Sequence, residues 1–178
     1  MTDLNTSDQT VTKTWGWTAP SGADPMNHWV RGEAIHGTGM FEMPIINHVK
    51  DNLYHGGYVD GIDLGDMFDS IVSLYQWEVY PTKGITYTYE MYDSGQVDIE
   101  TVEDAAKQVQ SCLDQGQKVL VHCQAGLNRS GIVVALVLMR QGMSADDAIA
   151  LLRNSRSDQV LCNKRFENWL RAYETKGE

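Results

Sequence analysis

The segment from Val119 to Gly131 holds the residues whose types and spacing best fit chemistry. It reads VLVHCQAGLNRSG, in which an apolar strand runs into Cys123, a short loop follows, and Arg129 precedes a helical pattern. Such a loop can wrap so that its backbone N–H groups point inward, and the following helix adds the positive end of its dipole. The sequence therefore predicts a cradle for a tetrahedral oxyanion between Cys123 and Arg129.

The residues of this segment suit that task individually. Gly126 permits a sharp backbone turn, and the planar fork of Arg129 can bind two phosphate oxygens at once. Positive surroundings lower the pKa of a cysteine below its ordinary value of roughly 8.5, which favours the reactive thiolate of Cys123. Attack on phosphorus would give a covalent phosphocysteine. The expected phosphate-binding positions are Gln124, Ala125, Gly126, Leu127, Asn128 and Arg129.

The pattern HCxxGxxRSG after an apolar strand resembles the signature of the protein tyrosine phosphatases. From roughly Asn47 to Tyr173 the chain is most similar to the small dual-specificity phosphatases, with the strand LYHGG and the closing segment RNSRSDQVLCNKRFENWL. The resemblance implies a cysteine-dependent phosphoric monoester hydrolase without metal or cofactor. Its substrate would be a protein or peptide carrying phosphotyrosine, and also phosphoserine or phosphothreonine.

The resemblance implies roles for three further residues. His122 would help to hold the thiolate of Cys123 through the hydrogen bonds of the loop, although a histidine ending a strand can also be purely structural. Ser130 would donate its hydroxyl to the sulfur and would also serve at the start of the helix. Asn163 matches an asparagine before the final helix and would support the site.

The leaving oxygen needs a proton, so a general acid must lie over the cradle. The family places an aspartate on a loop some thirty residues before the cysteine, and Asp93 stands at that distance from Cys123, directly after ITYTYEMY. Asp93 is therefore the expected acid, and it would act again as the base for the attacking water. Asp98 is the alternative acid, but it could instead begin the next helix, and Asp93 could be a turn residue before Gly95.

Two alternatives to a protein phosphatase remain open. Asn128 makes the loop GxNR, which resembles RNA 5′-triphosphatases of the same superfamily, although a formal net charge of −10 argues against a nucleic-acid partner. A phosphate-binding module without turnover would not need the thiol. The neutral loop argues against inositol polyphosphates. Cys112 and Cys162 are expected to be buried apolar residues, with a protective disulfide to Cys123 as the less favoured interpretation.

The surrounding pattern predicts an α/β fold, in which one domain has a central, mainly parallel sheet flanked by helices. Apolar and β-branched runs predict four strands, and apolar spacing of three and four predicts the helices. The predicted strands are 52–55, 71–75, 85–92 and 118–122, and the predicted helices are 100–113, 132–139, one that begins after Ser144 and one over 166–173.

Length and composition fit one globular domain, divided into a partly ordered N-terminal arm over residues 1–40 and a catalytic domain over 41–178. No apolar run is long enough to span a bilayer and no signal peptide is recognisable, so a cytoplasmic protein without membrane contact is expected. Basic residues gather between Arg153 and Lys176. They indicate either solvated helix faces or a basic rim beside the phosphate site. The sequence does not indicate an oligomeric state.

Overall fold

The computed structural model describes residues 17–18, 31–36 and 39–174. Most of the expected N-terminal arm lies outside these residues. From residue 17 to residue 44, β2 (Arg31–His36) pairs with β1 (Trp17–Thr18) on one side and with β3 (Gly39–Pro44) on the other, in a three-stranded antiparallel sheet. β3 therefore crosses the expected boundary at residue 40.

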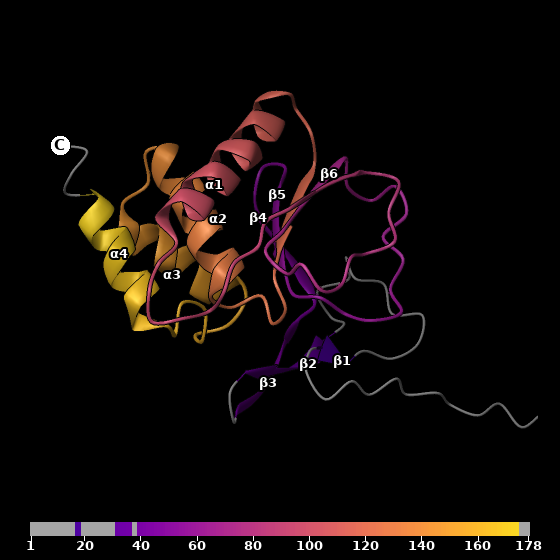
Figure 1. The fold of residues 1–178 in the computed structure, drawn as a ribbon, viewed down its shortest axis with the longest axis horizontal. Helices are drawn as coiled ribbons and strands as arrows, with labels where there is room; N and C mark the ends of the chain where they lie inside the picture. The colour runs from indigo at the N-terminus through magenta and orange to yellow at the C-terminus, as the bar shows by residue number, and fades with distance from the viewer. Residues whose placement is uncertain (1–16, 19–30, 37–38, 175–178) are drawn as a thin grey trace, which may run out of the picture.

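A five-stranded sheet forms the centre of the domain (Figure 1). Its strand order is β4-β5-β8-β6-β7, and the pairs β5–β8, β8–β6 and β6–β7 are parallel, whereas β4 runs antiparallel to β5. The expected mainly parallel sheet is confirmed. The strands are β4 (Ile46–Lys50), β5 (Leu53–Gly56), β6 (Ser70–Ser73), β7 (Ile85–Thr88) and β8 (Val119–His122).

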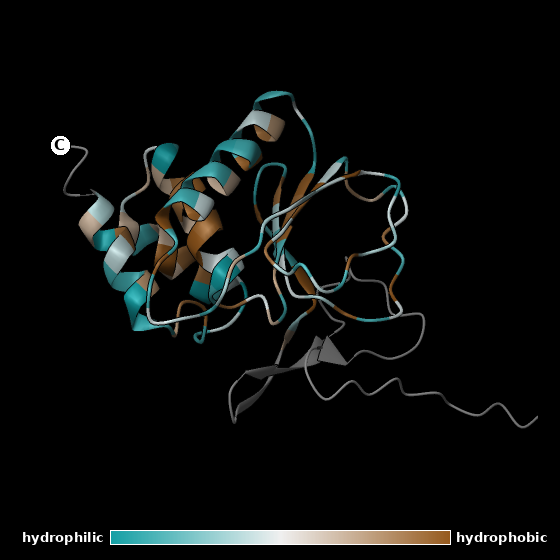
Figure 2. Ribbon diagram, in the orientation of Figure 1, coloured by the Kyte–Doolittle hydropathy of each residue, from teal (hydrophilic) through white to brown (hydrophobic). Residues whose placement is uncertain are grey.

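The four helices lie together on one side of this sheet (Figure 1). They are α1 (Ile99–Asp114), α2 (Arg129–Arg140), α3 (Ala145–Ser155) and α4 (Lys164–Glu174), as the apolar spacing predicted. Among them α2 is buried from Arg129 to Leu138, because its sequence is apolar nearly all round. Figure 2 shows this apolar helix behind more polar ones. Ser144 caps α3 by accepting a hydrogen bond from the Asp147 amide at 3.1 Å.

The strands show two main differences from the prediction. The strand predicted over residues 85–92 ends at Thr88, because its only sheet partner, β6, ends opposite it at Ser73. The chain is then released as an exposed loop that reaches α1. The edge strand β4 was not predicted, since its short sequence INHVK shows little alternation. Among the described residues, no helix combines the length and apolar character needed to cross a membrane.

Candidate active site

The loop from Cys123 to Asn128 joins the central strand β8 to the buried helix α2. β8 is buried along its whole length between β5 and β6, so Cys123 leaves the sheet from a fixed point. α2 begins at Arg129, and the side chain of Asn128 does not cap its N-terminus. The first N–H groups of α2 and the positive end of its dipole therefore face the loop.

Four consecutive carbonyl groups of this loop are held from outside. Main-chain N–H groups hold the first and last of them, and one arginine holds the two in the middle. The acceptors are the carbonyls of Gln124, Ala125, Gly126 and Leu127, and the donors are Tyr58 N (2.8 Å), Arg156 Nη2 (3.2 Å), Arg156 Nε (2.7 Å) and Leu161 N (3.2 Å) respectively.

This arrangement decides where the amide groups of the loop point. In a trans peptide the N–H lies opposite to the C=O, and every peptide bond among the described residues is trans. The outward carbonyls of residues 124–127 therefore direct the N–H groups of residues 125–128 toward the inside of the loop. Successive inward N–H groups can form a nest for an anion, here in the loop that directly follows Cys123.

Gly126 is required at the tightest point of the loop. Its φ of +67° lies in the left-handed region that favours glycine. A Cβ atom at this position would also collide with the guanidinium of Arg156 and the carbonyl of Gly56. Both constraints agree with the prediction that a glycine permits the turn.

Arg156 lies buried behind the loop, and its sequence context did not single it out. Besides the two loop carbonyls it donates to the carbonyls of Pro44 (2.7 Å) and Ile45 (3.4 Å) and to Asn47 Oδ1 (3.2 Å). Burial lowers the pKa of Arg156 to about 9, which leaves the guanidinium charged at neutral pH. The positive charge therefore stays behind the amide nest and adds to its attraction for an anion.

Arg129 approaches the loop from the other side. Its guanidinium donates to the carbonyls of Leu74 (3.3 Å) and Met91 (3.4 Å) and to Gln124 Oε1 (3.4 Å), and it lies 5.5 Å from the centre of the Tyr75 ring. These hydrogen bonds are long and could be exchanged for phosphate oxygens.

Cys123 precedes the loop and is 2% exposed. The hydroxyl of Ser130 lies 3.2 Å from Sγ. Nδ1 of His122 instead lies 3.3 Å from the Cys123 carbonyl, so this histidine contacts the backbone of the nucleophile. Burial, opposed by this hydrogen bond and reinforced by the charge of Arg129, lowers the pKa of His122 to about 4, and the ring is neutral at pH 7.

The two candidate acids occupy different places. Asp98 caps α1, where Oδ1 accepts the Thr101 amide at 3.1 Å. Asp93 lies on the exposed loop after β7, and its carboxylate accepts hydrogen bonds from Asn128 Nδ2 (2.8 Å) and Asn163 Nδ2 (2.7 Å). The structure thus brings Asp93, and not Asp98, to the rim of the phosphate loop.

Asn128 explains how the acid loop is held against the phosphate loop. Its buried side chain donates to Asp93 and accepts the main-chain N–H of Asn163 at 3.0 Å. It also lies 3.4 Å from Sγ of Cys162, which places this thiol beside Asn128. Cys112 lies buried on α1, and all three cysteines are free. The side chain of Asn163 contacts the acid loop directly through its hydrogen bond to Asp93, as a supporting residue would.

Tyr75, Trp77 and Tyr92 form an aromatic wall that was not predicted from the sequence. The ring centres of Tyr75 and Trp77 are 5.4 Å apart, and those of Trp77 and Tyr92 are 6.0 Å apart. Trp77 and Tyr92 are each 57% exposed, whereas Tyr75 is buried next to Arg129. Large exposed aromatic side chains beside a polar site are typical of ligand contact. A signal existed in the sequence, since Tyr92 precedes Asp93.

Three basic residues of the segment between Arg153 and Lys176 gather around one carboxylate. Glu167 accepts ion pairs from Arg153 (3.1 Å), Lys164 (2.6 Å) and Arg171 (2.8 Å). These hydrogen bonds outweigh the burial that opposes them and lower the pKa of Glu167 to about 2. These three cations are therefore engaged in an ion-pair cluster around Glu167, which agrees with the interpretation as helix-face charges.

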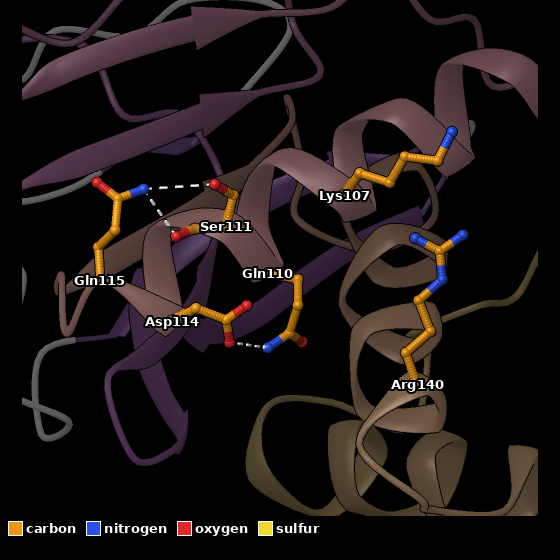
Figure 3. A pocket seen from close by; sticks show the side chains of 6 residues that line it. All are labelled: Lys107, Gln110, Ser111, Asp114, Gln115 and Arg140. Carbon is orange, nitrogen blue, oxygen red and sulfur yellow. Dashed lines mark hydrogen bonds between the residues drawn. The ribbon is translucent and has the colours of Figure 1, made fainter.

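A surface hollow between α1 and α2 does not belong to the candidate site (Figure 3). Arg140, which lines it, ends α2, about 16 Å along the helix from Arg129 at a rise of about 1.5 Å per residue. Its other lining side chains, from α1, include pairs that bond one another, such as Gln110 with Asp114. Among the described residues, no group of three or more His, Cys, Asp or Glu side chains could hold a metal ion.

Comparisons with known proteins agree with this geometry. The family model described as the dual specificity phosphatase catalytic domain matches residues 77–176, more than half of the chain. A protein tyrosine phosphatase domain-containing protein 1 from Danio rerio is 34% identical over 104 residues, which are 54% of this chain and 14% of that protein. The chain thus spans only a small part of this relative.

In two further matches, most of the length of the matched protein is covered. Protein 123R of Invertebrate iridescent virus 6 is 31% identical over 132 residues, which are 68% of this chain and 92% of the viral protein. The crystal structure of human DUSP28 matches with a TM-score of 0.65 at 22% identity and covers 75% of this chain and 95% of that one. The chain belongs to the dual-specificity phosphatase family of the protein tyrosine phosphatase superfamily.

Proposed function

We propose that this protein hydrolyses phosphotyrosine in proteins or peptides, and also phosphoserine or phosphothreonine, through a phosphocysteine intermediate. The observation that carries the proposal is that the carbonyls of residues 124–127 are all held from outside, which turns the amides of the loop after Cys123 inward as a ring of donors. A tetrahedral dianion fits this ring, and Arg129 can complete it with two further donors.

The proposed reaction has two steps. The thiolate of Cys123 attacks phosphorus, so that a P–S bond forms and the P–O bond to the alcohol breaks, while Asp93 gives its proton to the leaving oxygen. Water then attacks phosphorus and loses a proton to Asp93, and the P–S bond breaks. Ser130, 3.2 Å from Sγ, would donate to the departing thiolate. His122 would act on this thiol through the Cys123 backbone.

The aromatic wall favours an aryl phosphate as substrate. Trp77 and Tyr92 expose their rings beside Arg129 and the acid loop, where the ring of a phosphotyrosine held in the cradle would contact them. Such ring pairs contribute about 0.5–1.5 kcal/mol beyond the burial of their area. Trp77→Ala should therefore lower kcat/KM for a phosphotyrosine peptide several-fold more than for a phosphoserine peptide.

The residue behind the RNA 5′-phosphatase alternative has another explanation in the structure. Asn128 is 2% exposed, and its amide contacts Asp93 and the Asn163 backbone, so its presence is accounted for by the acid loop. Faster hydrolysis of 5′-triphosphorylated RNA than of a phosphotyrosine peptide would overturn the proposed substrate class.

The first experiment is hydrolysis of an aryl phosphate by the wild type and Cys123→Ser. We expect turnover that survives a chelator, is blocked by vanadate and is abolished in Cys123→Ser. Vanadate binding without any turnover in the wild type would instead support a phosphate-binding module. The reactive thiolate would also need a reducing compartment, so we propose a cytoplasmic location.

A further inference from the structure

A buried histidine lies behind the nucleophile and has no part in the mechanism above. His55 is 0% exposed on β5, the strand beside β8. Its Nε2 lies 2.9 Å from the hydroxyl oxygen of Ser130, whose oxygen lies 3.2 Å from Sγ of Cys123. The three side chains therefore form one continuous chain of hydrogen bonds that ends at the sulfur.

Which atoms donate and which accept in this series of hydrogen bonds follows from the number of protons that the three side chains carry. A thiolate can only accept, so the single hydroxyl proton of Ser130 must point at the sulfur of Cys123. The Ser130 oxygen is then an acceptor, and the atom that faces it, Nε2 of His55, must carry a proton. When Cys123 is protonated, the chain can run in the opposite direction.

The surroundings of His55 leave it only one ring proton. Burial, and then the charge of Arg156, hold the pKa of His55 well below 6.5, so the ring is neutral. Its Nδ1 has no hydrogen-bond partner among the described residues. A proton on Nδ1 would be a buried, unsatisfied donor, which is costly, whereas a proton on Nε2 has an acceptor.

The other charged or titratable groups around the phosphate loop make different contacts. Arg129 extends from α2, Arg156 supports the loop from behind, and His122 contacts the carbonyl of Cys123. Asp93 reaches the loop through Asn128. His55 differs from all of these, because its contact with the nucleophile passes through one hydroxyl group.

We propose that His55 is a positioning residue that donates its Nε2–H to Ser130 and thereby holds the Ser130 hydroxyl proton on the sulfur of Cys123. This contact stabilises the thiolate of the resting protein. Its second consequence, faster departure of the sulfur from phosphocysteine, rests on the proposed function. The first consequence does not, because it concerns the free thiol alone.

The test is the pH profile of Cys123 alkylation by iodoacetamide, followed on the peptide that contains this cysteine. We expect the midpoint of the profile to rise by about one pH unit in His55→Leu and in Ser130→Ala, since hydrogen bonds to charged groups have about this strength. His55→Gln, whose amide nitrogen can take the place of Nε2, should stay close to the wild type. Adding His55→Leu to Ser130→Ala should cause no further shift.

Three outcomes would overturn the proposal. They are an unchanged midpoint in His55→Leu, a further shift in the double variant, and an equal shift in His55→Gln. His48→Leu is the matched control, because His48 is exposed on the neighbouring strand β4 and should leave the midpoint unchanged.

Two points keep the test decisive. If His55→Leu does not fold, His55→Asn replaces it, since its shorter amide reaches the place of Nδ1 and not that of Nε2; a midpoint equal to that of His55→Gln would then contradict the proposal. Alkylation requires no substrate, so a protein that shows the expected shifts but no phosphatase activity would refute the proposed function and leave this inference standing.

Discussion

Arg129 and Arg156 bring the same guanidinium group to the phosphate loop from two sides, and they are held differently. Arg129 makes hydrogen bonds of 3.3–3.4 Å to groups beside the open side of the loop. Arg156 makes several bonds, the shortest of 2.7 Å, to carbonyls of the loop itself and to the carbonyl of Pro44 at the end of β3. Arg129 can exchange its hydrogen-bond partners for a ligand, whereas Arg156 is fixed by the main-chain carbonyls that it binds.

The difference separates binding from preorganisation. An inner group, Cys123 and Arg129, would contact the phosphate, whereas an outer group, Arg156, Asn128 and His55, would shape what surrounds it. Preorganised donors stabilise developing charge because they need no rearrangement during the reaction. Substitutions in the inner group should therefore affect catalysis, and those in the outer group should affect stability or the state of the nucleophile.

Among these substitutions, Arg129→Lys is expected to have the largest effect, which is a loss of activity. A lysine cannot supply two parallel donors to phosphate, so kcat/KM for an aryl phosphate should fall about 10³-fold. The melting temperature should change little, because the bonds that Arg129 makes are long. A variant that loses several degrees of stability together with activity would show that Arg129 also belongs to the outer group.

Arg156→Met should mainly lower the stability of the protein. It leaves buried carbonyl groups, including those of Ala125 and Gly126, without their donor, and we expect the free energy of unfolding to fall by about 3 kcal/mol in denaturant titrations. Arg153→Met is the matched control from the same segment, and its loss should be smaller because Arg153 is half-buried. Equal losses in the two variants would contradict the special position of Arg156.

Asp93→Asn compares the proposed acid with the helix cap. Turnover should fall about 10²-fold, since an amide cannot donate the proton, while inhibition by vanadate should remain. Asp98→Asn should retain activity and stability, because asparagine is also a good N-cap. If Asp98→Asn is the damaging change, the assignment of Asp93 as the acid is wrong.

The smallest expected effect concerns the pH dependence of stability, to which the buried His122 contributes. The pKa of His122 is about 4 in the folded protein, below the ordinary histidine value of 6.5, so the unfolded chain binds more protons between these two pH values. Stability from this group is complete above pH 6.5 and is lost as the pH falls toward 4, with a slope of up to about 1.4 kcal/mol per pH unit. His122→Gln should flatten this slope in denaturant titrations at several pH values. An unchanged slope would mean that the ring is charged in the folded protein.

The sequence by itself predicted the local features of the molecule. The helix predicted from Ile132, which begins three residues earlier at Arg129, and the strand ending at His122 both follow from apolar patterns of short range. The loop between Cys123 and Arg129 was also predictable, because its glycine, its arginine and the following helix are contiguous in the chain. For the same reason the helix cap at Ser144 was found.

Only the tertiary structure decided which distant residues surround that loop. Arg156 reaches it from the C-terminal end of α3, His55 contacts Ser130 from the neighbouring strand β5, and Asn163 joins Asp93 through a contact between residues 70 positions apart. No periodicity in the sequence marks such residues, since their positions depend on how strands and helices pack. Burial then sets their chemistry, because the same side chain that is a solvated cation at the surface becomes a fixed donor inside.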